Sequence, residues 1–270
     1  MSDLTDLGLL LLAGFVAGGI NAIAGGGTIL TFGLLSTILP AGPGRLVAAN
    51  VTSKIGLWPG AAAAAWAYRG SRAGQPAWAR WLVVPSVLGA VVGVGLLRWL
   101  PKESFDAVVP WLILLAAVLF AVQPQVARLG GGRDAGGGLA DPSRARMITT
   151  MLLQLLVGIY GGYFGAGIGI LMLAGLGVLG MGDVHALNAV KNLLATVING
   201  VATGMLVIGA AIGGFDISWQ HVAALAAGSI AGGLITPPLA RRLPAAAVRR
   251  LVSAIAFGLA GYHFWREWTG

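Results

Sequence analysis

Residues 7–39 read LGLLLLAGFVAGGINAIAGGGTILTFGLLSTIL and contain no charged side chain. As one continuous helix at 1.5 Å per residue, this run would reach about 50 Å. The hydrocarbon core of a bilayer is only about 30 Å thick. The triplet Gly25–Gly27 lies near the middle of the run, and each glycine in a helix costs about 1 kcal/mol. The run therefore predicts a broken helix or a tight helical hairpin, whose non-helical backbone is tolerated only inside protein or beside a cavity.

The composition of the whole chain indicates an integral membrane protein. Of its 270 residues, 57% are apolar and 10% are charged, whereas a soluble domain carries about 25% charged residues. Long apolar runs occupy residues 7–39, 46–67, 78–100, 107–123, 147–181, 186–213, 219–240 and 246–265. We therefore expect an all-α protein with about eight transmembrane helices, multi-pass in the cell (inner) membrane.

The charged residues indicate contact with lipid and not with nucleic acid. The net charge is +8, and the arginines fall in short connections between apolar runs, where they anchor topology and contact anionic headgroups. The chain has no cysteine, which excludes disulfides and thiolate-bound metals.

The apolar runs divide into two related halves. Residues 1–123 form the first repeat, 124–146 a polar linker rich in Gly and Arg, and 147–270 the second repeat. GGINAIAGGGT at 18–28 aligns with GIYGGYFGAGI at 158–168, and AANVTSK at 48–54 aligns with ALNAVKN at 186–192. We expect the first helix of each half to be broken at its glycine cluster.

We expect the glycines to have two roles, close packing of helices and lining of a substrate site. Small residues spaced as GxxxG let membrane helices approach closely. Four such pairs are Gly14/Gly18, Gly89/Gly93, Gly158/Gly162 and Gly228/Gly232. The clusters Gly25–Gly27 and Gly165–Gly169 are different, because an unwound backbone exposes N–H groups and the following helix N-terminus favours an anion. We expect these two clusters to line a substrate site.

Lys54 and Lys191 lie inside apolar runs, where a lysine costs about 2.5–3.5 kcal/mol on the insertion scale. Each could instead snorkel from a helix end. Nearby amides and hydroxyls can bind an oxyanion or bond a neighbouring helix, and they belong to Asn50, Thr52, Ser53, Asn188, Asn192, Thr196 and Asn199. The nine carboxylates all lie in termini, linkers or span ends, so the deep polar groups are cationic or neutral. This pattern predicts an anionic substrate.

Catalysis finds no support in the sequence. His185, His221 and His263 are far apart and near span ends, and no HExxH, GxSxG or paired-acid motif occurs. We expect no catalytic residue, no metal and no cofactor. A passive anion channel and a non-transporting scaffold subunit remain alternatives to a transporter.

The motif Asn21–Thr28 resembles the glycine-rich signature of the sulfite exporter TauE/SafE family, which includes 4-toluene sulfonate uptake permease-like transporters. Tyr163–Gly169 resembles its second-half copy. The chain departs from the family pattern at Asn21, often Asp there, at Thr28, often Gly, and at Gly33, where a proline is common. The resemblance implies movement of sulfite, organosulfonates or related sulfur-containing anions, as import or as export.

These arguments predict a substrate-binding set for a small anion. Its members are Asn21, Gly25, Gly26, Gly27, Thr28, Asn50, Ser53, Lys54, Gly165, Gly167, Gly169, Asn188, Lys191 and Asn192. The remaining partners would be the lipid bilayer and a coupling ion, with a proton and sodium both left open. A homodimer is left open as well.

Overall fold

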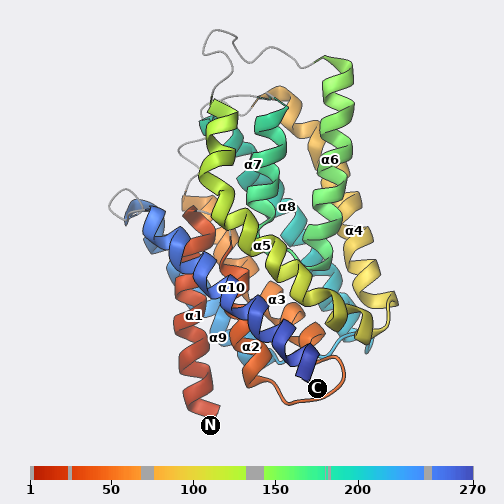
Figure 1. Ribbon diagram of the computed structural model, residues 1–270, viewed down its shortest axis with the longest axis vertical. Helices are drawn as coiled ribbons and strands as arrows, with labels where there is room; N and C mark the ends of the chain where they lie inside the picture. The colour runs from red at the N-terminus through yellow and green to blue at the C-terminus, as the bar shows by residue number, and fades with distance from the viewer. Residues whose placement is uncertain are drawn as a thin grey trace.

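The computed structural model describes residues 3–23, 26–67, 76–131, 143–179, 181, 184–239 and 245–269. Every regular element in those ranges is a helix, which confirms the predicted all-α class (Figure 1). The α-helices are α1 (Asp3–Ile23), α2 (Gly27–Ile38), α3 (Arg45–Ala67), α4 (Val83–Trp99), α5 (Lys102–Gly131), α6 (Arg144–Tyr163), α7 (Ile168–Val178), α8 (Val184–Ala211), α9 (Trp219–Leu239) and α10 (Ala245–Thr269). A 3₁₀ turn, η2 (Ala77–Leu82), precedes α4.

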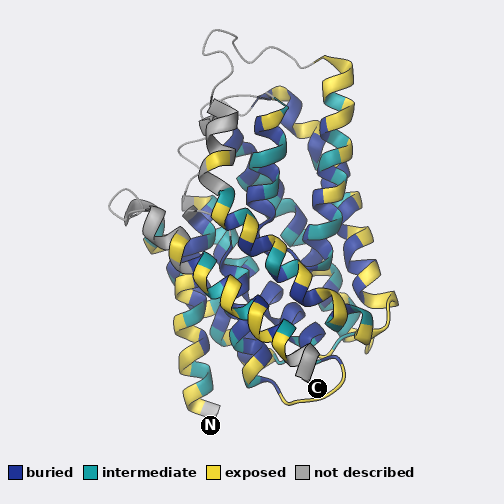
Figure 2. Cartoon of the chain, in the orientation of Figure 1, coloured by how far each residue is buried: buried dark blue, intermediate teal, exposed yellow. Residues whose placement is uncertain are grey.

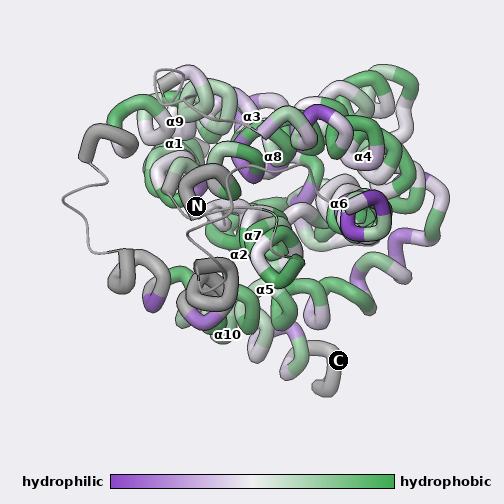
Figure 3. The backbone as a smooth tube through the Cα atoms, turned by 90° about the horizontal axis from the view of Figure 1, so that it is seen from above, coloured by the Kyte–Doolittle hydropathy of each residue, from purple (hydrophilic) through white to green (hydrophobic). Residues whose placement is uncertain are grey.

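Several helices have the length and composition of membrane spans. Among the described residues, five stretches qualify: Leu4–Ala22, Ala77–Trp99, Lys102–Val122, Arg144–Tyr163 and Ala189–Ala211. Large apolar side chains cover the outer surface, such as Leu12 and Leu156, exposed by 62% and 66%. Buried residues are most frequent in α2 and α3 (Figure 2), and hydrophobic residues predominate along the helices (Figure 3). Such an exterior is stable in lipid and not in water.

Two helix pairs pack through the GxxxG glycines. A Cβ on Gly18 would come within 2.4 Å of the Ser229 carbonyl oxygen, so α1 lies in direct backbone contact with α9. A Cβ on Gly162 would likewise come within 2.4 Å of the Ala90 carbonyl oxygen, which places α6 against α4. A Cβ would also meet backbone atoms within 2.6 Å at Gly14, Gly89, Gly93, Gly228 and Gly232, and at 3.1 Å at Gly158. The predicted packing role of these glycines is therefore confirmed.

Two helix pairs form hairpins. In the first hairpin, α2 returns beside α1, because a Cβ on Gly27 would meet the Ala17 carbonyl oxygen at 2.2 Å. In the second hairpin, α7 returns beside α6, with Gly175 against the Leu153 side chain. In Figure 1 the first hairpin occupies the end near the N-terminus and the second hairpin the opposite end. The N-termini of α2 and α7 both lie towards the middle of the molecule in this view.

Helices from both halves of the chain surround the hairpins. α3 packs against the first hairpin and α8 against the second, α3 and α8 contact each other, and α5 packs against α10. α5 continues to Gly131, inside the range predicted as linker, and α6 begins at Arg144. Residues 132–142 lie outside the described ranges, so the domain boundaries at 123 and 147 remain a prediction.

Candidate substrate-binding site

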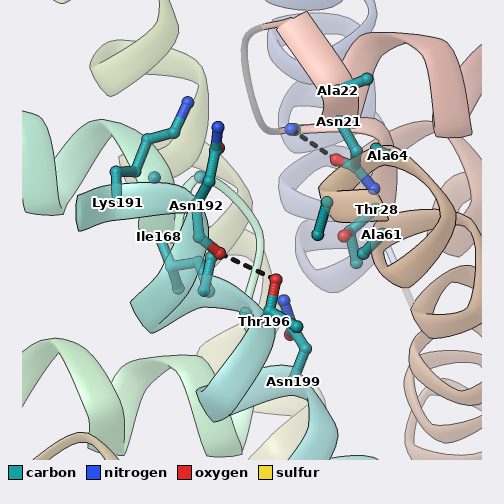
Figure 4. Close-up of a pocket in the computed structure, with 16 residues that line it drawn as sticks. Asn21, Ala22, Thr28, Ala61, Ala64, Ile168, Lys191, Asn192, Thr196 and Asn199 are labelled. Atoms are coloured by element: carbon teal, nitrogen blue, oxygen red, sulfur yellow. Dashed lines mark hydrogen bonds between the residues drawn. The ribbon is translucent and has the colours of Figure 1, made fainter. Parts of the chain in front are cut away.

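A cavity of about 80 Å³ lies where the two hairpin turns approach α3 and α8. Its volume suits a few water molecules or one small polyatomic ion. The residues that line it are Asn21, Ala22, Gly26, Thr28, Ala61, Ala64, Ala65, Gly165, Gly167, Ile168, Gly169, Lys191, Asn192, Ala195, Thr196 and Asn199. Figure 4 shows the residues of α8 on one side, facing Asn21, Thr28 and the α3 alanines on the other.

The N-terminus of α2 is closed by the side chain of Asn21. Its Oδ1 accepts hydrogen bonds from the backbone N–H groups of Gly26 and Gly27, both at 2.8 Å. The first amides of a helix have no partner within the helix, and a side-chain oxygen supplies one. Thr28 follows directly and lines the cavity. The first hairpin thus uses part of its anion-binding potential internally.

The N-terminus of α7 is formed differently. Gly165 and Gly167 adopt φ values of +89° and +77°, a region that costs other residues strain. Both line the cavity together with Ile168 and Gly169. Within the described ranges, no side chain accepts a hydrogen bond from the amides of Ile168 or Gly169. This helix end therefore presents its positive dipole to the cavity.

Lys191 lies beside that helix end. Its side chain is only 3% exposed, and a Cβ on Gly169 would contact Lys191 Cδ at 3.2 Å. Among the described residues, Lys191 Nζ makes no hydrogen bond and no ion pair. Asn192 and Asn199 line the same cavity, and the Thr196 hydroxyl donates to the Asn192 carbonyl oxygen at 2.8 Å (Figure 4). A lysine and a helix N-terminus repel each other unless an anion lies between them.

Lys54 has a different environment, although it is as deeply buried as Lys191. Its ammonium donates to the carbonyl oxygen of Gly161 at 2.8 Å and to that of Gly162. From one turn earlier in α3, Asn50 Nδ2 donates to the Tyr163 carbonyl oxygen at 2.9 Å. These are the last carbonyls of α6, which lack partners within their own helix. Both side chains therefore stabilise the C-terminus of α6, where a cation also complements the dipole.

The predicted set divides accordingly. The structure brings Asn21, Gly26, Thr28, Gly165, Gly167, Gly169, Lys191 and Asn192 together around the cavity. Gly27, Asn50, Ser53 and Lys54 are not among the lining residues, and the Ser53 hydroxyl is 2.7 Å from that of Thr31 in α2. Gly25 lies outside the described residues, as does the side chain of Asn188.

Sequence reasoning missed the small apolar part of the lining. Ala61, Ala64 and Ala65 form one face of α3, and Ala195 follows Lys191 by four residues along α8, before Asn199, which the sequence already places near the lysines. The helical period from Lys191 identifies Ala195 and Asn199. Nothing in the sequence marks the three α3 alanines within the run Ala61–Ala65, because their neighbours are identical.

An apolar helical chain with membrane-length helices, and an internal cavity lined by a buried lysine and three asparagines, has the architecture of a multi-pass membrane transporter. The chain belongs to the family described as Sulfite exporter TauE/SafE, whose sequence profile matches residues 10–263. The family resemblance of the glycine motifs is thereby confirmed.

Named relatives agree with this class. The chain is 29% identical over 263 residues to a probable membrane transporter protein of Haemophilus influenzae, covering 93% of this chain and 94% of the relative. It is 31% identical over 184 residues to a probable membrane transporter protein of Sinorhizobium sp, 64% of each chain. The chain thus spans slightly less than two thirds of that second relative.

Proposed function

We propose that this protein is a secondary transporter of a small sulfur-containing anion, sulfite or a short organosulfonate, in the inner membrane, and not an enzyme. One observation carries the proposal. Lys191 is buried beside the uncapped N-terminus of α7, and no carboxylate lies among the described residues of the cavity. The family name supports the sulfur chemistry of the substrate.

The electrostatics favour an anion. An unpaired ammonium away from water is costly, and the adjacent α7 N-terminus adds positive potential. An oxyanion between them would accept bonds from Lys191 Nζ and from the amides of Ile168 and Gly169, as anions do at helix N-termini. The side-chain amides of Asn192 and Asn199 offer further donors. Bound substrate would therefore relieve a repulsion present in the empty site.

The size of the cavity favours a small substrate. About 80 Å³ holds an oxyanion with at most a short substituent, because a few water molecules already fill such a volume. An aromatic sulfonate would require the surrounding helices to move apart. We therefore place inorganic sulfite and one-carbon sulfonates ahead of aryl sulfonates.

We further propose eight spans in two inverted halves, with the two glycine clusters interrupting the first apolar run of each half. The packing supports this: α1 contacts α9 as α6 contacts α4, and the same type of glycine pair mediates both contacts. The opposite directions of the two hairpins support it as well (Figure 1). Discontinuous helices meeting near the midplane are typical of transporters that alternate access.

A binding screen and a flux assay test this proposal. Purified full-length protein in detergent is heated with sulfite, methanesulfonate, thiosulfate or acetate, at equal ionic strength maintained with chloride. We expect the sulfur oxyanions to raise the unfolding midpoint and to cross proteoliposome membranes with saturable kinetics. Absence of any anion-dependent stabilisation would overturn the proposal. Stabilisation with a flux that does not saturate would identify a channel instead.

A further inference from the structure

The two sides of the cavity differ in chemistry. On α8, Lys191, Asn192 and Asn199 present groups that can donate hydrogen bonds. On α3, every lining residue is an alanine: Ala61, Ala64 and Ala65, at positions i, i+3 and i+4 of one helix face. Figure 4 shows Ala61 and Ala64 across the cavity from Lys191 and Asn192. α3 therefore contributes only methyl groups to the site.

This asymmetry has a consequence for an anion held by Lys191 and the N-terminus of α7. The part of the anion that lies against α3 itself meets only methyl groups, whereas Asn21 and Thr28, beside the alanines in Figure 4, offer an amide and a hydroxyl next to that face. An oxygen against the methyl groups loses its water without gaining a hydrogen bond from α3, which is unfavourable, and more so for a charged oxygen. The sulfur lone pair of sulfite, or the methyl group of methanesulfonate, is weakly hydrated and loses little free energy when it is placed against the alanines. The alanines Ala61, Ala64 and Ala65, which we call the α3 wall, therefore favour an anion that has no oxygen on the side facing them.

We propose that Ala61, Ala64 and Ala65 are specificity-determining residues that select anions with one face free of oxygen, such as sulfite or methanesulfonate, over anions with oxygens on every side, such as sulfate. The inference rests on the proposed function and goes beyond it, because it assigns the choice among sulfur oxyanions to the face opposite the charge. Sulfite and sulfate form the sharpest pair, since at alkaline pH both are dianions and they differ by one oxygen.

Serine substitutions on α3 test the proposal. Ala64→Ser and Ala61→Ser each place a hydroxyl donor on the wall with almost no change in volume. Ala63→Ser is the matched control, because Ala63 belongs to the same run but is not among the lining residues. Affinities for sulfite and sulfate come from thermal-shift titrations and from competition for sulfite flux. We expect the wild type and Ala63→Ser to prefer sulfite by at least about tenfold, which corresponds to about 1.4 kcal/mol.

In Ala64→Ser or Ala61→Ser this preference should fall by about tenfold through tighter sulfate binding, because a hydroxyl can now donate to the fourth oxygen. A second variant, Ala64→Val, narrows the wall without a donor, and we expect it to weaken methanesulfonate more than sulfite. If all three variants keep the anion preferences of Ala63→Ser, the α3 wall does not determine specificity. If the wild type binds no anion at all, the proposed function itself fails, which is a distinguishable result.

Discussion

The two hairpins satisfy their buried backbone groups at opposite ends. In the first hairpin, Asn21 provides an acceptor for the amides that begin α2. In the second hairpin, Lys54 and Asn50 provide donors for the carbonyls that end α6. Backbone groups without water must find protein partners, and either end of a helix interruption can be satisfied. The choice matters, because capping the carbonyls leaves the amides of α7 open to a ligand.

The two buried lysines also differ in the groups that they contact. Lys54 donates to two carbonyl oxygens of α6, whereas Lys191 faces a cavity. One lysine is therefore used in holding a helix end, and the other remains available to a substrate. Substitutions at four side chains test this comparison: Lys191, Lys54, Asn21 and Tyr160.

The largest effect is expected for Lys191→Met. Sulfite flux should fall by at least about tenfold, since a hydrogen bond from a charged group contributes about 1.5–3 kcal/mol and each 1.4 kcal/mol is about tenfold. The unfolding midpoint without anion should rise, because an unpaired buried charge is removed. Flux assays and thermal unfolding measure the two effects. Sulfite-dependent stabilisation that persists in this variant would remove Lys191 from the site.

Lys54→Met should have the opposite pattern. Two carbonyl oxygens of α6 lose their partner, and unsatisfied buried groups cost about 1–3 kcal/mol each. Removal of the buried charge offsets part of this cost, so we expect the free energy of unfolding to fall by about 2 kcal/mol. The thermal unfolding midpoint should still rise when sulfite is added. Chemical denaturation in detergent gives the first quantity and a thermal-shift titration the second. Were this variant to behave like Lys191→Met, the two lysines would share one role.

Asn21→Ala tests the cap of the first hairpin. The amides of Gly26 and Gly27 lose their acceptor, and loss of a side-chain acceptor at a helix N-terminus costs about 0.5–2 kcal/mol. Asn21→Asp keeps an acceptor and adds a favourable charge at a helix N-terminus, so it should retain the stability of the wild type. Equal losses in both variants would show that the hydrogen bonds of Asn21 do not matter.

The smallest effect is expected for Tyr160→Phe. The Tyr160 hydroxyl donates to the Ala166 carbonyl oxygen at 2.6 Å and so supports the turn of the second hairpin. Its loss should cost about 0.5–1.5 kcal/mol, with little change in anion affinity. A large loss of sulfite binding would mean that the turn, and not Lys191, controls the geometry of the site.

Composition and periodicity were enough to predict the all-α membrane class and the packing of the GxxxG glycines. An apolar composition is sufficient to indicate a lipid environment, and small residues four apart are sufficient to indicate close helix contacts. Both properties can therefore be seen within short stretches of sequence. The polar cluster around Lys191 was predictable for the same reason, since residues four apart share a helix face.

The different roles of Lys54 and Lys191 could not be predicted. Both lysines lie in apolar runs among asparagines, and their difference depends on which helix end lies opposite each one. That is decided by the contacts of α3 with the end of α6, residues about a hundred positions apart. The α3 wall could not be predicted either, because Ala61–Ala65 are five identical residues and the sequence does not indicate which of them face a cavity.

The glycine contact between α1 and α9 also constrains how the protein is made. α1 leaves the ribosome well before its partner α9, because the helices α2 to α8 lie between them in the chain. During synthesis, the groove at Gly14 and Gly18 must therefore remain covered by lipid or by a helper protein while most of the chain is inserted. Completion of the fold thus depends on a contact between distant segments, which is slow to form, and in a chain stopped before α9 the glycine face of α1 would lack its partner helix.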